Sequence, residues 1–190
     1  MIRAVVFDCF GVLASDGWLP YKARHFGDDP ERMEQATELN RQVDAGIISF
    51  NDFMRSIADM AGLSEAEARQ QIENNIPDED VFAIIARLKP RYKIGLLSNA
   101  GDNWLNDIFT PEQVAQFDAV ALSYDMGHSK PEFVAYQTIA RRLDVVPEEC
   151  IFIDDQPRYV AGAEAAGMHG ILYTDAEHLQ TELTRLMQLS

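Results

Sequence analysis

Residues that could do chemistry occur after several short apolar runs of this chain. They comprise three carboxylates, one lysine, and an adjacent hydroxyl and amide: Asp8, Asp154, Asp155, Lys130, Ser98 and Asn99. Two neighbouring carboxylates at the end of a buried strand repel each other, and a hard cation such as Mg²⁺ is the simplest remedy. An aspartate in such a site can attack an electrophile and form a covalent aspartyl intermediate. The set therefore suits phosphoryl transfer if the fold brings its members together.

Each of these side chains would have a role in a shared site. Asp8 is the predicted nucleophile, and it would bind Mg²⁺ together with the adjacent carboxylate pair and a backbone carbonyl. Lys130 would offset negative charge, while Ser98 and the side-chain or backbone amide of Asn99 would hold phosphoryl oxygens. Each residue alone also fits an ordinary turn, cap or surface position. The prediction therefore depends on their convergence.

The elements that would position these residues alternate between strand and helix. Five apolar runs predict buried strands, at 4–7, 94–97, 119–122, 150–153 and 170–173. Helical patterns occur at 81–88, 133–143 and 158–166. This order predicts an α/β fold, a three-layer Rossmann-like parallel sheet with helices on both faces. Ligands bind at the carboxyl ends of the strands in such sheets, where the reactive residues fall.

The first strand is separated from the second by a long stretch without strand character. Ser49 with Asp52, and Ser64 with Glu67, have the spacing of capping boxes that begin helices. We therefore expect residues 15–77 to form a small helical cap inserted after the first strand. The α/β core would comprise residues 1–14 and 78–190.

Composition limits the classes of partner. The chain has 190 residues and a net charge of −15, which disfavours binding to nucleic acid and to anionic membranes. Its two cysteines lie in apolar runs, as expected for reduced thiols. No apolar run approaches the about 18 residues of a membrane span. The sequence predicts a cytoplasmic protein that acts on a small molecule, and it leaves the oligomeric state open.

Four segments, VVFDCFGVL, LLSNA, SKPE and FIDDQ, resemble in order the signature motifs of the haloacid dehalogenase superfamily of aspartate-nucleophile hydrolases. The resemblance spans residues 4 to about 175, and the insertion is similar to the family's first type of cap. It implies a magnesium-dependent phosphatase with a phosphorylated metabolite as substrate. The implied metal ligands are Asp8, the backbone carbonyl of Phe10, Asp155, and Asp154 directly or through water. The implied phosphoryl-binding residues are Ser98, Asn99 and Lys130, and the implied catalytic residues are Asp8 and Lys130.

One position departs from the family's phosphatases. They carry a second aspartate, the general acid and base, two residues after the nucleophile, where this chain has Phe10. General acid–base catalysis is typically worth about 10²–10⁴ in rate. A good leaving group would make the acid unnecessary, or another residue would replace it. By proximity in sequence, the candidates are Asp16, His25, Asp102 and His128.

Other functions remain open at this point. Family dehalogenases carry an aromatic residue at the Phe10 position, but they are metal-free, whereas FIDDQ keeps two acids. A phosphonate hydrolase needs a Schiff-base lysine in the cap, and Lys22 is the only lysine of residues 15–77. A third possibility is a catalytically weak protein that binds a phosphometabolite or regulates a partner. Substrate specificity would come from the cap, with these residues of interest: Trp18, Tyr21, Arg24, His25 and Arg41.

Overall fold

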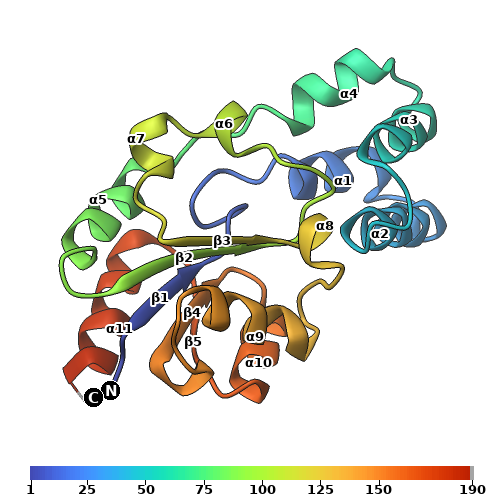
Figure 1. Cartoon of the computed structure of the whole chain (residues 1–190). Helices are drawn as coiled ribbons and strands as arrows, with labels where there is room; N and C mark the ends of the chain where they lie inside the picture. The colour runs from blue at the N-terminus through green and yellow to red at the C-terminus, as the bar shows by residue number, and fades with distance from the viewer. Residues whose placement is uncertain (189–190) are drawn as a thin grey trace.

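A computed structural model, which describes residues 1–188, contains one five-stranded parallel sheet (Figure 1). The strand order is β3-β2-β1-β4-β5. The strands are β1 (Ala4–Phe7), β2 (Lys93–Ser98), β3 (Ala119–Leu122), β4 (Cys150–Asp154) and β5 (His169–Leu172). The predicted α/β fold class is confirmed. The central strand, β1, pairs with both β2 and β4, so the residues that follow these three strands meet at one edge.

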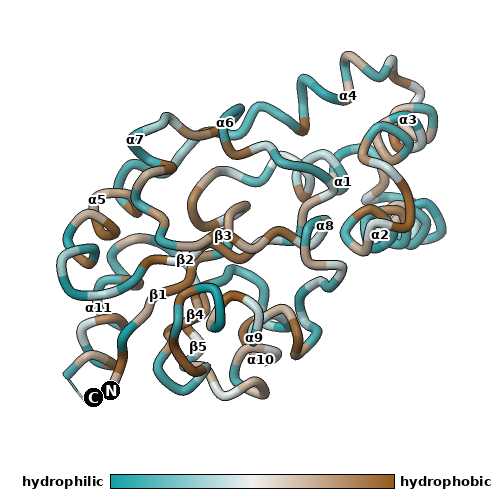
Figure 2. Tube along the Cα trace, viewed as in Figure 1, coloured by the Kyte–Doolittle hydropathy of each residue, from teal (hydrophilic) through white to brown (hydrophobic). Residues whose placement is uncertain are grey.

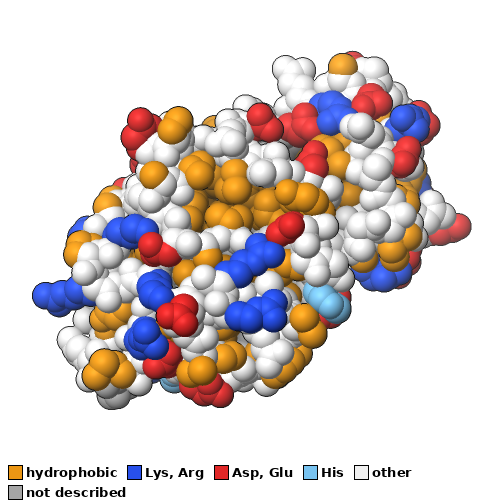
Figure 3. Space-filling model, in the orientation of Figure 1, with side chains coloured by type: hydrophobic (Ala, Val, Ile, Leu, Met, Phe, Trp, Pro, Cys, Tyr) orange, Lys and Arg blue, Asp and Glu red, His pale blue; other side chains and the backbone are white. Residues whose placement is uncertain are grey.

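Helices cover both faces of the sheet. One face carries α5 (Glu79–Leu88) and α11 (Ala176–Gln188), and the other carries α9 (Phe133–Arg142) and α10 (Pro157–Ala165) (Figure 1). The remaining core helices are α6 (Leu105–Ile108), α7 (Pro111–Val114), α8 (Ser123–Met126) and the 3₁₀ turn η1 (Pro147–Glu149). Hydrophobic side chains gather between the α6–α7 segment and β3 (Figure 3). No helix among residues 1–188 is long and apolar enough to cross a membrane.

Strand β1 is apolar throughout because both of its faces are covered. Val5 and Phe7 join one hydrophobic cluster, whereas Ala4 and Val6 join the cluster on the opposite face. All four side chains are buried, as expected for the centre of a parallel sheet. Asp8 is therefore delivered to the sheet edge by a strand that packing fixes on two sides.

Four helices lie between β1 and α5 and pack on their own hydrophobic cluster. They are α1 (Trp18–Phe26), α2 (Pro30–Asp44), α3 (Phe50–Ala61) and α4 (Glu65–Ile72). The side chain of Ser49 accepts a hydrogen bond from the backbone of Asp52, and Ser64 with Glu67 forms a complete capping box. The exposed turns of α4 are largely hydrophilic (Figure 2). The division of the chain into a core and a cap of residues 15–77 stays an interpretation.

Some boundaries differ from the predicted ones. Strand β5 begins one residue earlier than expected, and α10 is displaced by one residue relative to 158–166. The short helices α6, α7 and α8 were not predicted, because each has four residues and offers too little periodicity. These differences leave the polar residues at the strand ends in place.

We predict that replacing Ile57 with alanine lowers the free energy of unfolding by about 2–5 kcal/mol, because it empties part of the α1–α4 cluster. Ile57 is 0% exposed, whereas Ile47, in the same segment, is 64% exposed. The control Ile47→Ala should change stability by less than about 0.5 kcal/mol. Urea unfolding followed by circular dichroism measures both, and equal losses would contradict the assigned packing.

Candidate active site

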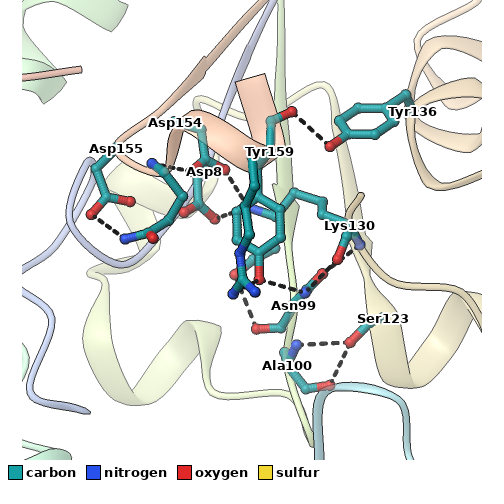
Figure 4. Close-up of polar contacts among 12 residues, drawn as sticks. Asp8, Asn99, Ala100, Ser123, Lys130, Tyr136, Asp154, Asp155 and Tyr159 are labelled. Atoms are coloured by element: carbon teal, nitrogen blue, oxygen red, sulfur yellow. Dashed lines mark hydrogen bonds and ion pairs between the residues drawn. The ribbon is translucent and has the colours of Figure 1, made fainter. Parts of the chain in front are cut away.

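The Lys130 side chain lies between two carboxylates at the sheet edge (Figure 4). Its Nζ is 2.7 Å from Asp8 Oδ1 and 2.6 Å from Asp154 Oδ2. All three residues are buried, with Lys130 at 3% exposure. The convergence of one lysine and two acids from distant parts of the sequence is thus present in the structure.

Neighbouring strands bring the two acids together. Phe7 pairs with Ile153, and the backbone N–H of Asp8 donates to the Ile153 carbonyl at 2.9 Å. Asp154 is the last residue of β4, and its Oδ1 accepts a hydrogen bond from the backbone N–H of Gln156 at 2.8 Å. Strand pairing therefore fixes the backbone of Asp8, and a hydrogen bond fixes the Asp154 carboxylate, while both carboxylates contact Lys130.

Burial and neighbouring charges together set the pKa values of Asp8 and Lys130. Burial and the Asp154 carboxylate together raise the pKa of Asp8 to about 8, although Lys130 acts in the opposite direction. Burial alone would lower the pKa of Lys130, but the charges of Asp154 and Asp8 more than offset it and raise the pKa above its usual value. Lys130 is therefore a permanent cation. More positive charge beside Asp8 would favour the ionised carboxylate that a nucleophile requires.

A third carboxylate completes the acidic group. One carboxylate oxygen each from Asp8, Asp154 and Asp155 lie within 4.8 Å of one another. Burial, followed by the charge of Asp154, raises the pKa of Asp155. Lys130 pairs with only two of these three carboxylates, and closely spaced carboxylate oxygens are the donors that Mg²⁺ prefers. The donor set fits a hard divalent cation.

Gly11 makes room for the third carboxylate. Its φ is +84°, and a Cβ built at this position would lie 2.7 Å from Asp155 Oδ2. Only glycine combines this left-handed backbone with such a close approach. Gly11 is not among the site residues predicted from the sequence, although its place three residues after Asp8 was a usable signal.

Asn99 holds the backbone of Lys130. Its Oδ1 accepts a hydrogen bond from the Lys130 N–H at 2.8 Å, and its Nδ2 donates to the Lys130 carbonyl at 3.1 Å (Figure 4). The Ser98 side chain is buried nearby, and its hydroxyl donates to the Asn99 carbonyl at 3.3 Å. The next residue, Ala100, is fixed by Ser123, whose Oγ accepts from the Ala100 N–H at 2.8 Å. The structure thus gives the Asn99 side chain a positioning role, and phosphoryl binding by Ser98 and Asn99 stays a prediction.

Phe10 packs against an aromatic partner. Its ring centroid lies 4.9 Å from that of Trp104, and both side chains are partly buried against the cluster beneath α5 and α11. The Phe10 side chain has no group that could donate a proton. The backbone carbonyl of Phe10 as a metal ligand stays a prediction.

The four residues proposed as replacement acids have other surroundings. Asp16 accepts hydrogen bonds of 2.7 and 3.3 Å from backbone N–H groups at the start of α1, so it caps that helix. His25 lies 2.9 Å from a glutamine side chain of α4, and His128 lies 2.9 Å from a glutamate at the start of α9. Asp102 is exposed. Three of the four are thus engaged in local contacts.

The specificity candidates of residues 15–77 also divide by their surroundings. Tyr21 is 2% exposed, and its hydroxyl donates to the Ile57 carbonyl at 3.2 Å, so it belongs to the helical cluster. Trp18 packs at the edge of the same cluster. Arg41 forms a surface ion pair of 2.6 Å with Glu38, and Arg24 is exposed. The roles of these residues in specificity stay predictions.

Three further residues near the site were missed from sequence. Tyr159 is buried beside Lys130, whose Nζ is 4.6 Å from the ring centroid, and its hydroxyl lies 3.4 Å from Asn99 Nδ2. Arg158 donates to the Tyr159 hydroxyl at 2.7 Å. Asp44, at the end of α2, interacts electrostatically with Lys130 and Arg158. Tyr159 and Arg158 follow FIDDQ closely, which was a signal, whereas Asp44 had none.

The chain is similar to known proteins over most of its length. The chain matches the family model of haloacid dehalogenase-like hydrolases over residues 2–167. It is 44% identical to "Phosphatase MT3486" of Mycobacterium tuberculosis, over 90% of this chain and 87% of that protein. It is 24% identical to D-ribitol-5-phosphate phosphatase of Bacteroides thetaiotaomicron, over 82% of this chain and 84% of that protein.

Solved structures share the fold. A haloacid dehalogenase-family enzyme of Bacteroides thetaiotaomicron, in complex with magnesium and inorganic phosphate, superposes with a TM-score of 0.71 at 23% identity. The alignment covers 94% of this chain and 99% of that one. On the family match and the 44% identical relative, the chain belongs to the haloacid dehalogenase-like hydrolase family.

Proposed function

We propose that the protein is a magnesium-dependent phosphatase that hydrolyses a small phosphorylated metabolite through an aspartyl-phosphate intermediate on Asp8. The observation that carries this proposal is the acidic group of Asp8, Asp154 and Asp155, two members of which form ion pairs with Lys130. The phosphatases among the relatives support the same reaction class. We further propose that residues 15–77 cover the site as a cap and limit the size of the substrate.

The acidic group would hold the metal ion. Asp8 and Asp155, with Asp154 directly or through water and the Phe10 carbonyl, would be its protein ligands. When bound, Mg²⁺ supplies positive charge that offsets the carboxylates and the phosphate together. Gly11 supports this role because it leaves the space in which the Asp155 carboxylate lies.

The reaction divides into steps that the chain's own residues perform. An Asp8 oxygen attacks phosphorus, and the ester oxygen leaves on the opposite side. Lys130 offsets charge at the nucleophile, and the Ser98 hydroxyl with the backbone amide of Asn99 would hold phosphoryl oxygens. The Asn99 side chain holds the Lys130 backbone in place through two hydrogen bonds. Water then releases phosphate from Asp8.

Phe10 keeps dehalogenation as the alternative, since a halide leaves without a proton. The acidic group argues against it, because a metal-free dehalogenase has no need of three carboxylates whose oxygens lie within 4.8 Å. Release of halide from 2-haloacids by the purified protein, without phosphate release from phosphate esters, would favour the alternative.

We predict that Asp8→Asn lowers magnesium-dependent hydrolysis of 4-nitrophenyl phosphate by about 10³-fold or more, because the variant lacks the nucleophile. Steady-state release of 4-nitrophenol, with magnesium or with a chelator, measures the effect. The matched control is Asp59→Asn, an exposed aspartate of α3. It should keep the wild-type rate. Similar rates for Asp8→Asn and wild type would exclude Asp8 as the nucleophile.

We also predict that magnesium alone stabilises the folded protein. A ligand that binds only the folded state at 100 times its Kd adds about 2.7 kcal/mol to the free energy of unfolding. Thermal unfolding should therefore show a higher Tm with Mg²⁺ than with chelator. The increase should shrink markedly in Asp155→Asn and persist in Asp59→Asn. A magnesium effect of equal size in all three proteins would place the ion elsewhere.

A further inference from the structure

Helix α2 ends against the loop that follows β2. A Cβ at Gly101 would lie 2.8 Å from Val43 Cγ2 and 3.3 Å from Phe50 Cβ. The loop backbone therefore lies in close contact with the end of α2 and the start of α3. Asp44 is the last residue of α2 and directly follows Val43. This contact places the Asp44 carboxylate beside Asn99 and the site.

Groups from α2 and from the core interact with the Asp44 carboxylate. Asn40, one turn earlier in α2, donates to Asp44 Oδ2 at 3.0 Å. From the core, Lys130, the Asn99 amide and Arg158 interact with the carboxylate, and Asp44 in turn affects Tyr159. Burial raises the pKa of Asp44 to about 6, although these cations and amides lower it. A carboxyl group with this pKa can both give and take a proton near neutral pH.

We propose that Asp44 is the general acid and base of the reaction, in place of the acid that the chain lacks at Phe10. This inference rests on the proposed phosphatase function. Asp8 approaches phosphorus from the end of β1, so an in-line leaving group departs away from the sheet, toward the helices of residues 15–77. Asp44 belongs to those helices, whereas Phe10 packs on Trp104.

The protons balance over the two steps. In the first, the bond from Asp8 Oδ to phosphorus forms, the ester P–O bond breaks, and the Asp44 proton passes to the leaving oxygen to give an alcohol. In the second, a water oxygen attacks phosphorus and the bond to Asp8 breaks. The Asp44 carboxylate takes the proton from that water. Each turnover consumes one water and returns Asp44 to its protonated form.

The test compares two aromatic esters in wild type and Asp44→Asn. Benzyl phosphate releases an alkoxide that needs a proton, whereas 4-nitrophenyl phosphate releases a stable anion. For benzyl phosphate, Asp44→Asn should lower kcat/KM by about 10²–10⁴-fold. For 4-nitrophenyl phosphate, kcat/KM should stay within a few-fold of wild type. For this ester, kcat and KM of Asp44→Asn should fall together, because hydrolysis of the aspartyl phosphate lacks its general base.

A pH profile gives a second, independent readout. With benzyl phosphate, wild-type kcat/KM should fall as the pH rises through about 6, because Asp44 loses its proton there. Asp44→Asn should lack this limb. Asn40→Ala removes a hydrogen bond that favours the charged carboxylate, so it should move the limb to higher pH. The Asn40→Ala variant still tests the inference if Asp44→Asn does not fold. The control Asp59→Asn should show the wild-type pH dependence of kcat/KM.

Each other outcome overturns the inference. Equal losses of kcat/KM for both esters in a folded Asp44→Asn would show a structural role, and unchanged rates would show no role. Hydrolysis of 4-nitrophenyl phosphate but not benzyl phosphate by the wild type would show that no acid operates. Absence of magnesium-dependent hydrolysis of either ester by the wild type would instead overturn the proposed function, and this inference with it.

Discussion

The contact of Lys130 with Asp8 and Asp154 is the interaction on which the arrangement of the site depends. Burying the Lys130 ammonium group away from water costs free energy. Two carboxylates, at 2.7 and 2.6 Å from its Nζ, offset that desolvation cost. Lys130 in turn stabilises the two carboxylates, because Asp8 and Asp154 would repel each other without the lysine. Adding Asp155 leaves more negative than positive charge at the sheet edge. The donor set at this edge of the sheet therefore fits a cation.

The positions of Asp8, Asp154 and Lys130 are fixed by the packing of the sheet and by hydrogen bonds outside the ion pairs. The order β2-β1-β4 at the centre of the sheet fixes the positions of Asp8 and Asp154, and hydrophobic burial on both faces fixes the strands. Lys130 lies in a loop, where its backbone would be free to move. Asn99, at the end of β2, holds that backbone by two hydrogen bonds. A loop residue thereby acquires the rigidity of the sheet.

The sequence predicts the position of a residue best where that residue directly follows a strand. Asp8, Asp154 and Ser98 could be predicted because β-branched runs indicate strands and parallel strands share an edge. Asp44 could not be predicted, because it stands at the end of a polar helix whose pattern contains nothing unusual. Its position depends on how tightly Gly101 lets α2 approach, and a sequence does not show a contact between two segments so far apart.

The aromatic side chain of Phe10 affects both the charge of the site and the source of the proton. Another acid at this position would add a fourth carboxylate next to Asp8, Asp154 and Asp155, where the charge of Asp154 already raises the pKa values of Asp8 and Asp155. An aromatic side chain instead extends the hydrophobic cluster through Trp104. If the proton comes from Asp44, nucleophile and acid belong to different parts of the chain, the sheet edge and the inserted helices. Proton transfer would then require the contact at Gly101, so the packing of α2 and α3 on this loop would itself be a condition for catalysis.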